Sequence, residues 1–213
     1  MHGFGIVPAV TDTAAGTGRR ERKKAETRAA LHRAALDLFA TNGFRETRVN
    51  DIAEAADVAP ATFFRHFRSK EEVALVDVMA RIDAFIAGLE GRPDREGPLA
   101  ACRALVDTPA GAGLTPGPDE MVVAGLIAVN PSLSGDFFWQ MTKVTGRLAI
   151  EFCRRMGVGH TDLRPQLLAS AVVGSLNAVL VTWLADPVAT NPQELSRQAF
   201  AALGDGMDWP SAL

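Results

Sequence analysis

Thr62, Arg65 and His66 lie at helical spacing in the stretch APATFFRHFRSKEEV, and each carries a group that can hydrogen-bond to a nucleic acid. Phe63 and Phe67 are interleaved with them, one helical turn apart, so they share one face and can pack on a core. A guanidinium and a hydroxyl on the opposite face suit base edges in the major groove of DNA. The pattern predicts a short helix with an apolar inner face and a DNA-reading outer face.

Groups suited to phosphate flank this helix on both sides. Lys70 stands at the start of the following helix and Arg48 near the start of the preceding one, where helix N-terminal amides also favour anions. We expect Thr47 to cap the preceding helix. The basic run GRRERKK, Gly18 to Lys24, could touch the backbone or the minor groove.

The helices that must position these groups follow from apolar periodicity and turn residues. Glu26 to Thr41 is helical by period, and Asn42-Gly43 is a typical left-handed cap. A second helix runs from Thr47 to about Ala56, and Asp57 stands at a turn because Asp tolerates positive φ. Pro60 suits the first turn of a third helix that ends near Phe67. Together these elements predict a helix-turn-helix.

A longer helical region follows. Ser69 and Glu72 form a capping box that begins a helix through Glu90. No alternating strand pattern of useful length occurs, so the expected fold is all-α with about nine helices. The remaining helices are expected at Pro98–Asp107, Asp119–Val129, Ser134–Met156, Asp162–Ala185 and Asn191–Leu203, with a loop at Thr108–Pro118. The expected parts are a disordered basic arm (1–24), a helix-turn-helix domain (25–70) and a larger helical domain (71–213).

Charge is distributed unevenly along a chain whose net charge is −3. Residues 1–70 hold 12 Lys and Arg against 8 Asp and Glu, a net of +4, whereas residues 71–213 hold 10 against 17, a net of −7. A basic end on an acidic body indicates a polyanion-binding module joined to another domain. A solvated basic tail has the same composition.

The number of cysteines and the hydropathy of the chain indicate the cellular compartment of the protein. Cys102 and Cys153 are too few for a disulfide framework, so we expect reduced thiols in the cytoplasm. The first residues show no signal-peptide pattern. Gln166 to Ala185 is uncharged over the length of a membrane span, but its Ser, Asn, Thr and Gln residues favour a core helix or a subunit interface.

The run from Arg28 to Val73 resembles the TetR family of bacterial transcriptional regulators. The resemblance rests on AALDLFATNGF, VNDIAEAADVAPATFFRHF and SKEEV, in that order. Three positions depart from the family pattern: Asp57 replaces the usual turn Gly, Ala59 the usual capping Ser, and Phe64 the usual Tyr. The family's Tyr hydroxyl commonly meets a phosphate, so Phe64 implies an apolar contact instead, with a sugar or a thymine methyl. TFFRHF and LIAVNPSL resemble the actinobacterial branch of mycofactocin-type regulators, which includes members resembling fatty-acyl-CoA sensors.

The resemblance implies a homodimer whose recognition helices enter successive major grooves of a palindromic operator, roughly 34–36 Å apart. It implies that residues 71–213 bind a small effector, an acyl-CoA or another apolar molecule, which shifts the helix beginning at Ser69 and releases the DNA. Some members of the family activate transcription or need a co-repressor, so the resemblance leaves open whether the effector releases the protein from DNA or promotes its binding. No metal or other cofactor is expected. The expected DNA-binding residues are Thr47, Arg48, Ala59, Pro60, Thr62, Phe64, Arg65, His66 and Lys70.

Candidate residues for the effector pocket and the dimer come from the second domain. Asn177 is distinctive because an unpaired amide in an apolar helix costs about 1–3 kcal/mol, so it should meet a ligand, a neighbour or its own copy. The other pocket candidates are equally typical of an ordinary core. The pocket candidates are Phe85, Leu89, Leu105, Met121, Leu126, Phe138, Met141, Thr142, Thr145, Asn177 and Trp183. The dimer candidates are Leu168, Val172, Gly174, Ala178, Leu195, Phe200 and Leu203.

Three other classes of protein were weighed against a DNA-binding regulator with a small effector. An enzyme is disfavoured because the four histidines are scattered and no nucleophile elbow, metal-spaced cluster or phosphate-binding glycine loop occurs. A redox-responsive regulator could use Cys102 or Cys153. A nonspecific nucleic-acid-binding protein would leave Thr62 and His66 without a role.

Overall fold

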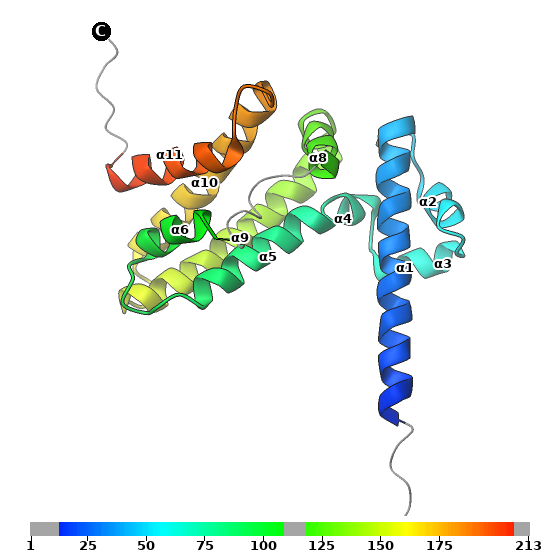
Figure 1. Cartoon of the computed structure of the whole chain (residues 1–213), viewed down its shortest axis with the longest axis horizontal. Helices are drawn as coiled ribbons and strands as arrows, with labels where there is room; N and C mark the ends of the chain where they lie inside the picture. The colour runs from blue at the N-terminus through cyan, green and yellow to red at the C-terminus, as the bar shows by residue number, and fades with distance from the viewer. Residues whose placement is uncertain (1–12, 109–117, 207–213) are drawn as a thin grey trace, which may run out of the picture. The chain divides into compact units, whose positions relative to one another are not determined.

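The computed structural model describes residues 13–108 and 118–206 (Figure 1). Regular structure in these two ranges is entirely α-helical and falls into ten helices. The all-α prediction is therefore confirmed, with one helix more than expected. The chain divides into two compact units, residues 1–73 (unit 1) and residues 74–213 (unit 2). The predicted loop from Thr108 to Pro118 lies almost wholly outside the described residues.

Unit 1 begins with α1 (Thr13–Asn42), which is longer than predicted. Residues 13–24, expected as part of a disordered arm, are helical instead, while residues 1–12 lie outside the described ranges. Residues 19–24 are all Arg, Lys or Glu, which are strong helix formers, and Arg22 pairs with Glu26 one turn later. At the other end Gly43 adopts φ +87°, which confirms the predicted left-handed cap.

Helices α2 (Val49–Ala55) and α3 (Pro60–His66) pack with α1 as a helix-turn-helix. In the turn between them Asp57 adopts φ +53°, as predicted, and it is the only non-glycine residue in the described ranges with a positive φ. The three helices bury a common apolar core. Its members are Leu31, Ala35, Phe39, Phe44, Ile52, Ala53, Phe63 and Phe67.

The predicted helix from Ser69 to Glu90 is interrupted. It forms as α4 (Lys70–Ala74) and α5 (Val76–Glu90), with Leu75 between them at φ −91° and ψ 1°. The Ser69 half of the predicted capping box is confirmed, because the Ser69 hydroxyl accepts a hydrogen bond from the Glu72 amide at 3.2 Å. The Glu72 carboxylate accepts from the amide of Arg68, one residue earlier than a capping box requires. No Gly or Pro marks the interruption, which lies beside the boundary between the two units.

Unit 2 continues with α6 (Pro98–Val106), α8 (Pro118–Val129), α9 (Pro131–Met156), α10 (Leu163–Ala185) and α11 (Pro192–Gly204). Pro at the first turn of α6, α9 and α11 begins each helix without losing a needed amide. Helices α5, α6, α9, α10 and α11 share one core. It includes Ile86, Leu89, Ala101, Cys102, Leu148, Phe152, Ala169, Val172 and Phe200.

A buried arginine fixes the end of α5 against α9. The side chain of Arg155 is 0% exposed, and its guanidinium bonds to the Glu151 carboxylate at 2.7 Å. The same group donates to the carbonyl oxygens of Leu89, Arg92, Pro93 and Glu96. A guanidinium has five N–H donors, and the last carbonyls of a helix lack intrahelical partners, so each side satisfies the other. Hydrogen bonds from Arg154 chiefly lower the pKa of Glu151, which keeps the carboxylate ionised.

Replacing Arg155 with Met should lower the free energy of unfolding by about 1–3 kcal/mol, because the carbonyl oxygens after α5 would lose their buried donor, although Arg154 would still pair with Glu151. Urea denaturation followed by circular dichroism measures this loss. The matched control is Arg197→Met, which breaks an exposed ion pair with Asp107 and should cost less than about 1 kcal/mol. Equal effects of the two substitutions would contradict the role assigned to Arg155.

Candidate DNA-binding helix and effector cavity

Helix α3 is only seven residues long, so it depends on its anchors. Phe63 and Phe67 are both buried, with ring centroids 5.7 Å apart. Arg28 of α1 lies over the Phe67 ring at 4.1 Å and donates a hydrogen bond of 2.7 Å to the His66 carbonyl. Sequence reasoning missed Arg28, although a basic residue one turn before buried Leu31 could have been examined as a partner for α3.

The outer face of α3 carries the predicted base-reading residues. Ala59 caps the helix without a side-chain bond, and Pro60 follows it in the first turn; both are exposed. Arg65 is exposed, and Phe64 is 60% exposed with its ring packed edge-on against Phe63 at 5.4 Å. The structure therefore brings these four residues to the accessible side of a short, anchored helix. Thr62 and His66 are half-buried at its margins.

His66 stands in a positive environment. Burial is the main cause that lowers its pKa below 6.5, and the charges of Arg65, Arg28 and Lys24 lower it further. The imidazole is therefore neutral at pH 7 and has one nitrogen that donates and one that accepts. A neutral His66 suits a base edge better than a phosphate.

Thr47 and Arg48, both predicted to contact DNA, lie at the start of α2, but only Arg48 is accessible. Arg48 is the N-cap residue and is exposed, and its amide donates to the Asp51 carboxylate at 2.8 Å. Thr47, predicted as the cap and as a DNA contact, is only 1% exposed. Its hydroxyl donates to the carbonyl oxygens of Gly43 at 2.8 Å and Leu38 at 3.3 Å. The capping prediction for Thr47 was wrong, and burial removes its side chain from the DNA contacts.

Lys70, predicted as a phosphate ligand, is held inside unit 1. Its ammonium donates to the carbonyl oxygens of Phe44, Arg45 and Thr47 and lies 4.4 Å from the centre of the Phe44 ring. An ammonium has three N–H donors, and all three are used here. The prediction missed this because loop carbonyls distant in sequence cannot be read from helix spacing. Lys70 therefore joins α4 to the segment that leads into α2.

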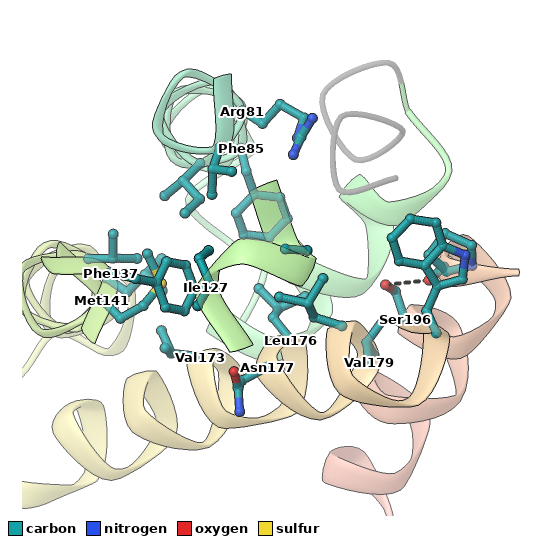
Figure 2. Close-up of a pocket in the computed structure, with 18 of the residues that line it drawn as sticks. Arg81, Phe85, Ile127, Phe137, Met141, Val173, Leu176, Asn177, Val179 and Ser196 are labelled. Atoms are coloured by element: carbon teal, nitrogen blue, oxygen red, sulfur yellow. Dashed lines mark hydrogen bonds between the residues drawn. The ribbon is translucent and has the colours of Figure 1, made fainter. Parts of the chain in front are cut away.

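Unit 2 encloses an apolar cavity of about 120 Å³ between α5, α8, α9, α10 and α11. Figure 2 shows Phe85 and Arg81 extending from α5, with Phe137 and Met141 on another wall. Ser196 of α11 also borders the space, but its hydroxyl donates to the Pro192 carbonyl at 2.8 Å. Arg81 is the one charged residue of the described lining. The cavity therefore suits a small apolar body with few polar groups.

Four of the predicted effector residues line this cavity: Phe85, Met141, Asn177 and Trp183. The structure places the others elsewhere, in three groups. Leu89 and Leu105 are core residues, Leu126 and Thr145 are half-buried outside the lining, and Met121, Phe138 and Thr142 are exposed. Residue type alone could not separate these groups, because cores and cavity walls use the same side chains. The lining residues missed include Arg81, Ile82, Ile127, Phe137, Leu176 and Ser196.

Asn177 borders the cavity but is an exposed residue, so it does not meet the expectation of a buried amide. Figure 2 shows its side chain beside α10, whereas Phe85 and Arg81 extend from α5. The burial cost predicted for an unpaired amide therefore does not apply within one chain. A contact with a second copy remains a proposal.

The predicted dimer residues divide between a surface groove and the core. Gly174, Ala178, Leu195 and Leu203 line an open groove between α10 and α11, and Leu168 is half-buried. Val172 and Phe200 were misplaced, because both lie in the core of unit 2, at 0% and 1% exposure. Helical phase explains the error, since Val172 lies on the side of α10 that faces the core.

Helix α10 is long and apolar enough to cross a membrane by length and composition, with a mean hydropathy of 1.9. Only 22% of that stretch is buried within the chain. The core helices of soluble proteins pass the same test. Its exposed apolar surface is typical of a helix that a partner covers.

The cysteines show little capacity for redox chemistry. Cys102 is completely buried, and burial raises the pKa of its thiol to about 12. Because the thiolate is the reactive form, Cys102 is a poor oxidant sensor at neutral pH. Cys153 is also buried, with its sulfur 3.8 Å from the Gly159 carbonyl oxygen. Across residues 13–108 and 118–206, no group of three His, Cys, Asp or Glu residues is arranged to hold a metal.

A helix-turn-helix with an exposed Arg on its second short helix, joined to a helical unit with an apolar cavity, defines a DNA-binding regulator with an effector domain. The profile "Bacterial regulatory proteins, tetR family" matches residues 31–75, and that of the "MftR C-terminal domain" matches residues 100–208. The chain belongs to the TetR family of bacterial transcriptional regulators. The predicted family is thereby confirmed.

Known relatives agree with this assignment. The chain is 39% identical over 170 residues to the HTH-type transcriptional regulator TcmR of Streptomyces glaucescens, covering 76% of this chain and 75% of that protein. It is 28% identical over 193 residues to the putative mycofactocin biosynthesis transcriptional regulator MftR of Mycobacterium tuberculosis, covering 88% and 94%. The structure of the SmeT–triclosan complex shares the fold, with a TM-score of 0.61 at 18% identity over 88% of this chain and 96% of that chain.

Lys70→Met should weaken DNA binding indirectly, by loosening the segment that leads into α2. Methionine keeps an apolar stem but cannot donate hydrogen bonds to the carbonyl oxygens of Phe44, Arg45 and Thr47. The dependence of log Kd on log salt concentration should therefore keep its slope. Arg48→Gln is the matched comparison, because loss of one phosphate contact from an exposed arginine should reduce the slope by about 0.9. Fluorescence anisotropy between about 50 and 200 mM salt measures both slopes. A reduced slope for Lys70→Met would restore its role as a phosphate ligand.

Proposed function

We propose that this protein is a cytoplasmic, homodimeric repressor that binds a palindromic operator and is released from it by a small apolar effector. One observation carries the proposal. The chain combines an anchored recognition helix with an exposed Arg65 in unit 1 and an apolar cavity of about 120 Å³ in unit 2. The first suits sequence reading and the second suits a ligand.

On DNA, α3 would enter the major groove with its exposed face toward the bases. Arg65 would donate to a guanine, the commonest specific contact of an arginine, while Thr62 and His66 would meet neighbouring base edges. Arg48 and the exposed basic residues of α1, such as Arg20 and Lys24, would meet phosphates. Lys70 would contribute indirectly, by holding the segment before α2.

The dimer would form through α10 and α11. Gly174 and Ala178 lie four residues apart on α10, facing the groove beside α11, and would allow close approach of a second copy. A partner there would cover apolar residues that are exposed in one chain, including Leu167 and Val181. A two-fold axis through this face would pair the two recognition helices with the two halves of a palindrome.

Effector release would act through α5. Val78, Ile82 and Phe85 of this helix line the cavity, and α5 follows α4 directly after Leu75. A ligand that prefers the α5 position found in the DNA-free form would shift the population toward that form. An acyl-CoA is one candidate, but the cavity is large enough for only part of such a molecule.

Arg65→Ala should lower affinity for the preferred site by about 1–3 kcal/mol and relax the base preference at one position. The preferred site is first selected from random duplex DNA and compared with the DNA flanking the protein's own gene. A gel shift at about 150 mM salt with random competitor DNA then measures binding. The matched control is Arg33→Ala, which removes an exposed arginine of α1 and should leave the base preference unchanged. Equal loss on specific and random DNA would mean that Arg65 does not read bases.

Phe64→Ala should weaken binding because the exposed ring is placed to contact a thymine methyl. Replacing individual thymines of the selected site with deoxyuridine removes only that methyl group. One such replacement should weaken binding by the wild-type protein and leave Phe64→Ala unaffected. If no deoxyuridine replacement distinguishes the two proteins, Phe64 does not contact a thymine methyl.

A further inference from the structure

We propose that the exposed N-terminal part of α1 is a rigid basic extension that binds the phosphate backbone of duplex DNA outside the half-site contacted by α3. This inference rests on the proposed DNA-binding function and assigns to it a second contact surface. The surface consists of residues 18–26, here called the α1 extension, and every one of these residues is exposed. Figure 1 shows this blue part of α1 continuing beyond the part that has α2 and α3 beside it.

The α1 extension is continuous with a helix that is fixed within unit 1. From residue 18 onward, the first buried residue of α1 is Leu31. Shortly before it, Arg28 donates a hydrogen bond of 2.7 Å to the His66 carbonyl and lies over the Phe67 ring at 4.1 Å. The packed part of α1 therefore supplies the costly helix nucleus, and each residue added to it gains a backbone hydrogen bond. The direction of the extension is set where Arg28 meets α3.

The charge of the α1 extension requires an anionic partner. It holds five Lys and Arg against two Glu, a net of +3. Arg22 pairs with Glu26 at 3.8 Å, an exposed contact that contributes little. Arg20 and Lys24 are like charges four residues apart, a spacing that destabilises a helix by about 0.2–0.5 kcal/mol. Phosphates beside the helix would offset this repulsion, and their neutralisation would release the counterions of the DNA.

The basic side chains begin next to the recognition helix. Arg20, Lys24 and Arg28 are spaced by four residues, so they lie on the side of α1 that contacts α3 at Arg28. Burial is the main cause that lowers the pKa of His66, and the charge of Lys24 also lowers it. Lys24 therefore lies within electrostatic reach of the end of α3, and Arg20 lies one turn further out.

The length of the α1 extension determines where it would meet DNA. The helix rises about 14 Å from Arg19 to Arg28, at 1.5 Å per residue. Neighbouring phosphates of one strand are about 3.4 Å apart along the helix axis, so this length corresponds to about four base pairs. With α3 in the major groove, the extension would reach the backbone beside the half-site.

The composition of the α1 extension favours DNA over an anionic membrane. A helix that lies on a membrane surface buries large apolar residues along one face. Residues 18–26 read GRRERKKAE and contain no large apolar residue. A basic surface of this kind suits contacts with phosphate that do not depend on base sequence.

The test varies the length of DNA around the selected site. Flanks of changing sequence grow from none to about eight base pairs on each side, and fluorescence anisotropy measures Kd at about 100 mM salt. Wild-type affinity should rise by about tenfold and level off at flanks of about four base pairs. In the double variant Arg20→Gln/Lys24→Gln the gain should fall to about threefold or less. The control Arg103→Gln/Lys143→Gln removes the same charge from exposed positions of unit 2 and should keep the gain.

A further variant separates a rigid extension from a flexible tail. Ala25→Pro keeps every charge but interrupts the helix between Lys24 and Arg28, because proline lacks an amide hydrogen and clashes with the carbonyl four residues earlier. It should lose the flank-dependent gain as the double variant does. All variants should bind the duplex without flanks as tightly as the wild type, which verifies that unit 1 is folded.

The outcomes separate this inference from the proposed function. A wild-type affinity that does not change with flank length, or a full gain in Arg20→Gln/Lys24→Gln, would overturn the α1 extension as a DNA contact and leave the regulator intact. A full gain in Ala25→Pro would contradict its rigidity. A wild-type protein that selects no site from random DNA would refute the proposed regulator, and this inference with it.

Discussion

The burial of two phenylalanines on one side of a seven-residue helix is the constraint on which the DNA-binding unit depends. An isolated helix as short as α3 is unstable in water, so its order comes from tertiary contacts. Phe63 and Phe67 supply the apolar contact, and Arg28 donates a hydrogen bond to the last carbonyl of α3, that of His66. Asp57 provides the turn that orients the helix. Because the inner face is fixed, the outer face with Phe64 and Arg65 is ordered before DNA arrives. Preorganisation of this kind reduces the entropy that binding must overcome.

Not every basic residue of such a protein is available to an anion. Lys70 and Arg155 both direct their donors at backbone carbonyls, Lys70 before α2 and Arg155 after α5. In both cases a cation replaces the hydrogen-bonding partners that an irregular segment lacks. A count of positive charge near the recognition helix therefore overestimates the number of phosphate contacts. Arg48, which is exposed at the start of α2, remains a better candidate.

Local signals predicted much of the fold, and long-range contacts explain the failures. The caps at Gly43 and Ser69 and the turn at Asp57 depend on residues adjacent in sequence, and each formed as predicted. Lys70 failed because its partners are loop carbonyls 23 to 26 residues away, which periodicity does not describe. Thr47 failed because its hydroxyl bonds back to Gly43 and Leu38 and not forward to α2. In unit 2 the helices were placed within a few residues. Their rotation was not, so Val172 was assigned to an interface and Leu89 to a pocket although both face the core.

Helix α5 is the element shared by the cavity and by the covalent connection to the DNA-binding unit. It contributes Arg81 and Phe85 to the cavity wall, and it begins one residue after α4, whose Lys70 holds the segment before α2. A ligand changes DNA affinity only through its preference for one position of α5, and a shift from 1:99 to 99:1 requires a preference of roughly 10⁴-fold. Apolar contacts are non-directional, so they discriminate weakly between positions that differ by a small rotation. An apolar effector must therefore obtain that preference by packing closely against residues such as Ile82 and Phe85 in only one position of α5.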